Sequence, residues 1–182
     1  AYDKAIQQLN QLVGTSSDAS IAGQNSEALK YRQELARAYL NRGILNRGTE
    51  MPAEARKDYD EAKRLLKQLC DSVPERAEYR KELATVLNNL GNLLVSNQDQ
   101  RKDAAAFYRE GLALTESLVS DFPNTPAYRK DLAEAINSLA AVFYYDGELA
   151  EAEALWIRSR ETITELIRDQ PGIPDYQSLL AR

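Results

Sequence analysis

Histidine is missing from this chain of 182 residues, and cysteine occurs only once. Without histidine the commonest general base is absent, and a zinc site has no plausible set of ligands. A single cysteine cannot form a disulfide within the chain, which argues against a disulfide-stapled scaffold. The sequence also lacks a Gly-rich phosphate loop, a nucleophile elbow and a metal-ligand cluster. We therefore expect no enzyme activity from this chain alone and no cofactor.

Long apolar runs and clusters of positive charge are lacking as well. No stretch approaches the roughly 20 apolar residues of a membrane-spanning helix, so we expect no membrane insertion. Lysine and arginine are spread among more numerous acidic residues, and the net charge is −5. Nucleic acids and anionic membranes attract concentrated positive patches, so the sequence predicts that neither is a partner. No signal peptide is visible, and we expect a cytoplasmic location.

Proline and glycine are scarce, with 6 and 8 residues respectively, whereas Ala, Leu, Glu, Arg and Gln are plentiful. These abundant residues lose least on entering a helix. Hydrophobic residues make up 43% of the chain, which is enough to bury a sizeable core. The composition therefore predicts an ordered, all-α protein.

A phrase of the form Tyr-Arg-x-x-Leu-Ala recurs with a period of 48 or 49 residues. Its copies begin at Tyr31, Tyr79 and Tyr128, and a worn copy begins at Tyr176. Further landmarks keep the same step, namely an alanine, an aromatic residue four positions later, and then a proline. They are Ala55, Tyr59 and Pro74; Ala104, Tyr108 and Pro123; and Ala152, Trp156 and Pro171. Because residues i and i+4 share one helix face, we expect all three aromatic residues to pack in the core.

Each period is expected to form two helices. The first helices are predicted near residues 31–47, 79–96 and 128–145, and the second helices near 52–71, 101–121 and 148–169. Pro126 is a plausible first-turn proline, and Thr125 before it is expected to cap that helix. The recurring Arg129 is expected to pair with an acidic neighbour such as Asp169.

The chain is predicted to be one array over residues 1–182. It comprises the second helix of a partial repeat (1–13), a connector and helix start (14–30), three repeats (31–78, 79–127 and 128–175) and the start of a further helix (176–182). Residues 14–26 fit either an ordered loop or a flexible linker. Because the chain begins and ends inside this pattern, we expect it to be a fragment of a longer protein.

These landmarks resemble the tetratricopeptide repeat, in which Leu-Gly in the first helix precedes Ala-x3-aromatic and a proline. Leu90-Gly91 stands where that pair belongs, with Arg42-Gly43 and Leu139-Ala140 as variants. A standard repeat has about 34 residues, and the extra length here lies at the outer ends of the two helices. In this long period the chain is similar to arrays attached to bacterial serine/threonine protein kinases. The resemblance implies a right-handed solenoid of helix pairs in a bacterial signalling or scaffold protein.

The resemblance also implies that the first helices line a concave groove for a peptide or partner protein. The candidate binding residues are Arg37, Asn41, Arg47, Asn88, Asn89, Asn92, Asn137, Tyr144 and Tyr145. In the third repeat, Glu134, Ser138 and Ala141 would lie in the same groove. An amide side chain donates and accepts hydrogen bonds, so asparagine can hold an extended peptide backbone. Arginine can meet a carboxylate, and tyrosine can anchor a partner.

Two plainer interpretations stay open for these residues. The polar ones also fit an ordinary solvated helix face, and the two tyrosines also fit packing at a helix end. A second function class is the alternative to an interaction module, namely a structural spacer or a solenoid that associates with itself through exposed repeat ends.

Overall fold

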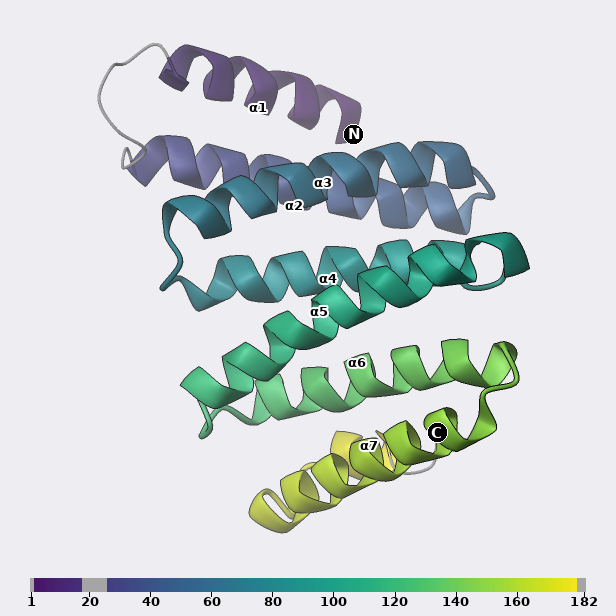
Figure 1. The fold of residues 1–182 in the computed structure, drawn as a ribbon. Helices are drawn as coiled ribbons and strands as arrows, with labels where there is room; N and C mark the ends of the chain where they lie inside the picture. The colour runs from purple at the N-terminus through teal and green to yellow at the C-terminus, as the bar shows by residue number, and fades with distance from the viewer. Residues whose placement is uncertain (1, 18–25, 180–182) are drawn as a thin grey trace. The chain divides into compact units, whose positions relative to one another are not determined.

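The computed structural model describes residues 2–17 and 26–179, and every regular element in these two stretches is helical (Figure 1). The α-helices are α1 (Tyr2–Ser17), α2 (Ser26–Gly48), α3 (Pro52–Ser72), α4 (Ala77–Leu94), α5 (Arg101–Asp121), α6 (Pro126–Tyr145), α7 (Leu149–Asp169) and α8 (Pro174–Leu179). A short 3-10 helix, Gln98–Gln100, precedes α5. These residues contain no strand, which confirms the all-α fold. Over the same residues, no helix combines the length and hydropathy needed to cross a membrane.

The helix ends follow the sequence closely, apart from the region near the N-terminus. The second helices α3, α5 and α7 begin and end within one residue of their predicted bounds. Residues 14–17 were expected to open the connector, but they complete α1, because extending a formed helix costs far less than nucleating one. Residues 18–25 of the expected connector lie outside the described residues. The helix α2 begins at Ser26, ahead of Tyr31, on a run of good helix formers.

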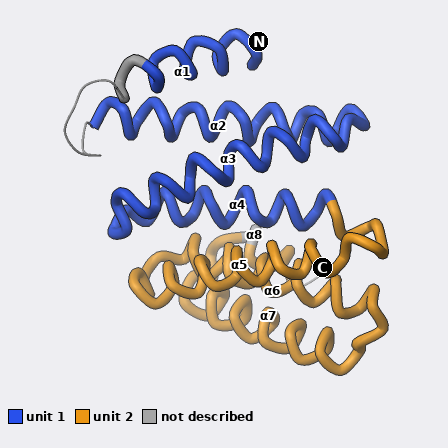
Figure 2. Tube along the Cα trace, turned by 45° about the horizontal axis from the view of Figure 1, so that its top comes forward, with its two compact units in different colours: residues 1–93 blue, residues 94–182 orange. Residues whose placement is uncertain are grey.

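The chain divides into two compact units, Ala1–Leu93 and Leu94–Arg182 (Figure 2). The first unit contains α1 to α4 up to Leu93, and the second contains α5 to α8. In the first unit α1 packs on α2, and α2 pairs with α3. In the second unit α5 packs on α6, α6 pairs with α7, and α7 contacts α8.

The first unit is built around a close approach between Gly43 of α2 and Tyr59 of α3. The ring of Tyr59 is fully buried, as the sequence predicts. A Cβ atom at Gly43 would lie 2.5 Å from Cε1 of this ring and 2.7 Å from Cδ1. The glycine therefore makes the room into which the aromatic ring fits.

A charged cluster joins α1, α2 and α3 beside this contact. The guanidinium of Arg42 donates to Asp58 through Nη2 at 2.6 Å and through Nε at 3.0 Å, and Asn46 donates to the same carboxylate at 2.9 Å. Asp58 is buried, with 3% of its surface exposed. On its outer side, Arg42 donates to the exposed Asp3 of α1 at 2.6 Å. These bonds satisfy the buried carboxylate, which would otherwise be costly.

The third repeat fills the same three positions with apolar residues. Leu139, Phe143 and Leu155 replace Arg42, Asn46 and Asp58. In the second unit these residues belong to one hydrophobic cluster with Tyr108, Leu112 and Ile136. The charged cluster of the first unit is therefore a local substitute for apolar packing.

The prediction that Trp156 packs in the core is wrong. Tyr108 is buried, but 41% of Trp156 is exposed. Its repeat carries Ala140 where the first repeat has Gly43, and at Gly43 a Cβ would overlap the ring of Tyr59, which stands at the position of Trp156. The short α8 covers Ile163 and Leu166 through Tyr176 and Leu179, but Trp156 is not part of that cluster.

Two smaller expectations have mixed outcomes. Pro126 does occupy the first turn of α6, but Thr125 makes no side-chain capping bond. Arg129 pairs with Asp169 at 2.6 Å, as expected, and the hydrogen bond from Arg129 is the main cause of the lowered pKa of Asp169. This pair links the start of α6 to the end of α7.

Removing the carboxylate of Asp58 should leave the guanidinium of Arg42 without its buried partner, with only the exposed Asp3 as an acidic neighbour. We expect Asp58→Ala to lower the free energy of unfolding by about 3 kcal/mol. The triple replacement Arg42→Leu, Asn46→Phe and Asp58→Leu installs the residues of the third repeat, and it should retain stability or raise it by about 1–4 kcal/mol. Urea denaturation followed by circular dichroism measures both. A triple variant less stable than Asp58→Ala would show that apolar packing cannot replace the charges.

Adding one methyl group at Gly43 should destabilise the first unit. The overlap with the Tyr59 ring should cost about 1–3 kcal/mol, which outweighs the gain of up to about 1 kcal/mol in helix propensity. The matched control is Gly14→Ala in α1, where a Cβ meets nothing within 4 Å. We expect thermal unfolding to show a lower midpoint for Gly43→Ala and an unchanged or higher one for Gly14→Ala. Equal midpoints would contradict the close-approach argument.

Candidate partner-binding site

The first helices of the unit 1–93 carry six of the candidate residues. Arg37, Asn41 and Arg47 lie on α2, and Asn88, Asn89 and Asn92 lie on α4. Steps of three and four residues place most of them along one face of each helix. We call this set the amide face. Asn88 and Asn89 are half-buried, whereas the other four are exposed.

A carboxylate on α4 holds the two helices of the amide face together. Glu82 accepts hydrogen bonds from Nε of Arg37 at 3.0 Å and from Gln33 of α2 at 2.7 Å. Arg37 also pairs with Glu34 on its own helix at 2.9 Å. The hydrogen bond to Glu82 is the main cause of the raised pKa of Arg37. Arg37 is thus engaged by acids of this chain, and it fastens α2 to α4.

The asparagines of the amide face differ in the hydrogen bonds that their side chains make. The amide nitrogen of Asn89 donates to the backbone oxygen of Thr85, one turn earlier, at 2.9 Å. The side-chain amides of Asn41 and Asn88 make no hydrogen bond to any residue in 2–17 and 26–179. Both amide groups are therefore available to donate to and accept from a bound peptide backbone.

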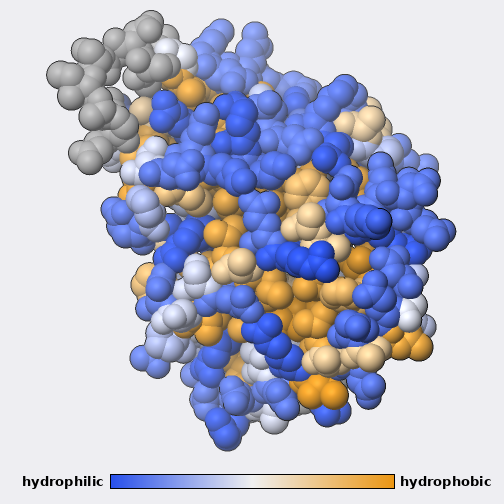
Figure 3. Space-filling view, in the orientation of Figure 1, coloured by the Kyte–Doolittle hydropathy of each residue, from blue (hydrophilic) through white to orange (hydrophobic). Residues whose placement is uncertain are grey.

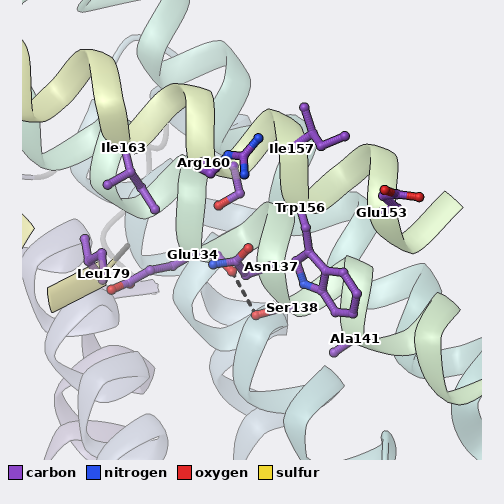
Figure 4. Close-up of a pocket in the computed structure, with 11 residues that line it drawn as sticks. Glu134, Asn137, Ser138, Ala141, Glu153, Trp156, Ile157, Arg160, Ile163 and Leu179 are labelled. Atoms are coloured by element: carbon purple, nitrogen blue, oxygen red, sulfur yellow. Dashed lines mark hydrogen bonds between the residues drawn. The ribbon is translucent and has the colours of Figure 1, made fainter. Parts of the chain in front are cut away.

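The second unit contains a pocket of about 850 Å³ between α6, α7 and the end of α8 (Figure 4). From α6 it is lined by Glu134, Asn137, Ser138 and Ala141, and these are four of the positions at which the family resemblance places the groove. From α7 it is lined by Glu153, Trp156, Ile157, Ser159, Arg160 and Ile163, and from α8 by Leu179. The candidate Asn137 therefore lies in a hollow that its neighbours on α6 share. We call this the α6–α7 pocket.

The two serine hydroxyls that line the α6–α7 pocket are both satisfied by backbone oxygens. Ser159 donates to the backbone oxygen of Ala133 at 3.0 Å, across the helix pair. Ser138 donates to the backbone oxygen of Glu134 at 3.0 Å, along its own helix. The indole of Trp156 extends from α7 toward Ser138 and Ala141 (Figure 4). An exposed indole beside small side chains offers a flat apolar contact for a partner.

Two exposed tyrosines stand beside this pocket at the end of α6. Tyr144 and Tyr145 have 53% and 55% of their surface exposed. The ring of Tyr144 lies 5.6 Å from that of Trp156 and 5.9 Å from that of Tyr145. Arg101 places its guanidinium 5.4 Å from the centre of the Tyr145 ring and donates to the Tyr145 backbone oxygen at 2.9 Å. The tyrosines thus pack on neighbours and still present large apolar surfaces.

Apolar surface is unevenly distributed on the face seen in Figure 3. Hydrophobic side chains gather over α5 and α6, whereas polar ones dominate over α1 and α3. The exposed large hydrophobic residues of the second unit include Tyr144, Tyr145, Leu149, Trp156 and Ile157. Of these, Tyr144, Tyr145 and Trp156 are in ring contact with one another through Tyr144, and exposed apolar side chains that cluster in this way mark surfaces that bind a partner.

Sequence reasoning missed Trp156 and Ile157 as surface residues. The regular spacing of the aromatic landmarks suggested a core position, yet the two side chains are 41% exposed. One signal was available, because the Gly43 and Gly91 positions become Ala140 in this repeat alone. The described part of the chain contains no group of three or more Asp, Glu, Cys or His residues placed to hold a metal ion.

Comparison with known proteins agrees with the repeat pattern. A family model for the tetratricopeptide repeat matches residues 83–126 and 132–171. The crystal structure of BtubC (BKLC) from P. vanneervenii is similar in fold, with a TM-score of 0.55 and 21% sequence identity. That similarity covers 94% of this chain and 59% of BtubC. The chain therefore spans less than two thirds of that protein.

No curated protein matches the chain. The family model nevertheless covers most of two consecutive periods, including Gly91, Tyr108 and Trp156. The helix pairs α2 with α3 and α6 with α7 provide the architecture that this repeat requires. The chain thus carries two stretches, residues 83–126 and 132–171, that match the tetratricopeptide repeat directly.

Proposed function

We propose that this chain is a protein-interaction module that binds a peptide or a partner segment against its first helices. Tetratricopeptide repeats generally mediate contacts between proteins, and this chain has the repeat. The observation that carries the proposal is the α6–α7 pocket, where Asn137 shares a hollow with an exposed indole. In the same proposal, the module belongs to a larger cytoplasmic signalling or scaffold protein of bacteria.

The amide face supports a second area of contact. Asn41 and Asn88 are not engaged by described residues, and Asn89 uses only its donor on its own helix. An extended backbone offers alternating donors and acceptors that such amides can pair with, whatever its side chains are. Arg47, exposed in the last turn of α2, adds a positive charge for an acidic group of the ligand.

Replacing the three asparagines of α4 should weaken peptide binding without weakening the fold. Peptides of about 16 residues selected by display against the wild-type protein are the probe, with affinities measured by fluorescence anisotropy. The triple replacement Asn88→Ala, Asn89→Ala and Asn92→Ala should reduce their affinity by about tenfold or more, since lost hydrogen bonds accumulate along a backbone. Its thermal midpoint should stay nearly unchanged.

The matched control is a triple replacement of exposed polar residues on α3, Lys57→Ala, Lys67→Ala and Gln68→Ala, which should leave the affinity unaltered. If the selected peptides bind the asparagine variant as tightly as the wild type, the amide face is not a binding surface. If selection yields no peptide that binds at micromolar concentration, the interaction module itself is contradicted.

The second candidate function is a structural solenoid that associates with itself. The exposed apolar residues Trp156 and Ile157 favour it, because uncovered stacking surfaces of repeat proteins tend to associate. In that case the weight-average mass from light scattering should rise with protein concentration, and Ile157→Glu should abolish the rise. A constant monomer mass over the micromolar range would contradict self-association.

A further inference from the structure

Arg37 of the amide face is a cation that reaches the solvent. Its side chain is 45% exposed, and Asn41 lies one turn further along the same face of α2. The period places Thr85 and Glu134 at the equivalent positions of the other two repeats, and neither is a cation. A peptide backbone held by Asn41 would therefore pass beside a positive charge that the first repeat alone provides.

All three nitrogen atoms of this guanidinium already donate to acids of the chain. Nε and Nη2 donate to the same oxygen of Glu82, at 3.0 and 2.5 Å, and Nη1 donates to Glu34 at 2.9 Å. Arginine binds a carboxylate most strongly through a pair of parallel N–H groups. Glu82 occupies the Nε and Nη2 edge that could form such a pair. A ligand carboxylate can use that edge only by displacing Glu82.

Displacing Glu82 is unfavourable, because its carboxylate has little access to water. The side chain of Glu82 is 18% exposed, and its oxygen Oε2 is buried without a hydrogen bond to any described residue. The other oxygen accepts from Gln33 at 2.7 Å as well as from Arg37. Without Arg37, a largely buried carboxylate would lose its counter-ion, and such a loss is strongly destabilising. That penalty opposes the binding of an acidic ligand at Arg37.

The two acids also repel a ligand carboxylate directly. Glu34 and Glu82 both lie within hydrogen-bonding distance of the guanidinium, so a carboxylate that approaches Arg37 also approaches two negative charges. A neutral group of the ligand meets neither penalty. The amides of Asn41 and Asn88 stay available to its backbone.

We infer that Glu82 is a specificity-determining residue of the amide face, because it withholds Arg37 from acidic ligands. The face then selects segments whose residue beside Arg37 carries no negative charge. The inference rests on the proposed function and specifies the ligand at one position. A purely structural role of Glu82, as the link between α2 and α4, predicts instead that its removal weakens the fold and the binding of every ligand alike.

Replacing Glu82 by glutamine should open Arg37 to acidic ligands. Glutamine keeps the size of the side chain and an oxygen that accepts from Gln33, but it removes the charge. The probes are display-selected peptides whose affinity depends on the asparagines of α4, each substituted by aspartate at one position at a time. At one or two neighbouring positions, aspartate should raise the affinity for Glu82→Gln by about fivefold or more relative to its effect on the wild type. Fluorescence anisotropy measures each affinity, and added salt should reduce the gain.

Two control variants localise the effect. Glu78→Gln removes the same charge from an exposed position of the same helix, where the acid pairs with Arg76 at 3.3 Å, and it should produce no gain. The double variant Arg37→Gln and Glu82→Gln should lose the gain, because the cation that receives the aspartate is then absent. Thermal scans by circular dichroism verify that each variant is folded.

Three results would overturn the inference. One is an aspartate scan on Glu82→Gln without a gain at any position while the selected peptides still bind, which would leave the proposed function intact. Another is a gain that persists in the double variant, since Arg37 would then play no part in it. The third can be measured even if Glu82→Gln does not fold. Aspartate that strengthens binding to the wild type, and loses this effect in Arg37→Gln, would show that Arg37 already accepts ligand acids.

The failure of the proposed function gives a different result from the failure of this inference. If no selected peptide depends on the asparagines of α4, the amide face is not a binding surface, and the inference falls with it. If the peptides depend on the asparagines but respond to aspartate equally in the wild type and in Glu82→Gln, only the role of Glu82 is contradicted.

Discussion

The contact between Gly43 on α2 and the ring of Tyr59 on α3 is the close approach around which the first unit packs. At Gly43 the missing side chain lets the Tyr59 ring press against the backbone of α2, and the ring is then fully buried. Because the interior of a protein has almost no spare volume, one added methyl group changes where the ring can go. Ala140 makes that change in the third repeat, where Trp156 is turned toward solvent. The repeat that has alanine instead of glycine at this position is thus the one whose aromatic residue is exposed.

The two units carry different kinds of side chain at equivalent positions of their helix pairs. In the first, Arg42, Asn46 and Asp58 form a hydrogen-bonded cluster where the third repeat has leucine and phenylalanine. These hydrogen bonds join α2 to α3 at the place where apolar side chains join α6 to α7. The first unit thus presents a polar face of asparagines, and the second presents an aromatic pocket.

The helical architecture was largely predictable from the sequence. The 48- to 49-residue step of Tyr31, Tyr79 and Tyr128 fixed the helix pairs, since a repeated phrase constrains every copy at once. Local signals were less reliable, and Gly14 to Ser17 continued a helix that polar composition suggested would end. The pocket was not predictable, because the repeat pattern places Trp156 at a core position and only the packing of α6 and α7 shows that 41% of it is exposed. The engagement of Arg37 by Glu82 was also invisible, because it depends on side chains 45 residues apart in different helices.

The central claim is that the surface of α7 around Trp156 is open, although equivalent surfaces are closed. Acrylamide quenching of the unliganded protein at low micromolar concentration tests it most directly. The comparison protein carries its only tryptophan at the buried position 108, through Tyr108→Trp in a Trp156→Phe background. The account predicts that Trp156 is quenched several-fold more strongly than the tryptophan at position 108, as its exposure implies. Equal protection of the two would contradict the account, because the surface proposed to receive a partner would then already be covered.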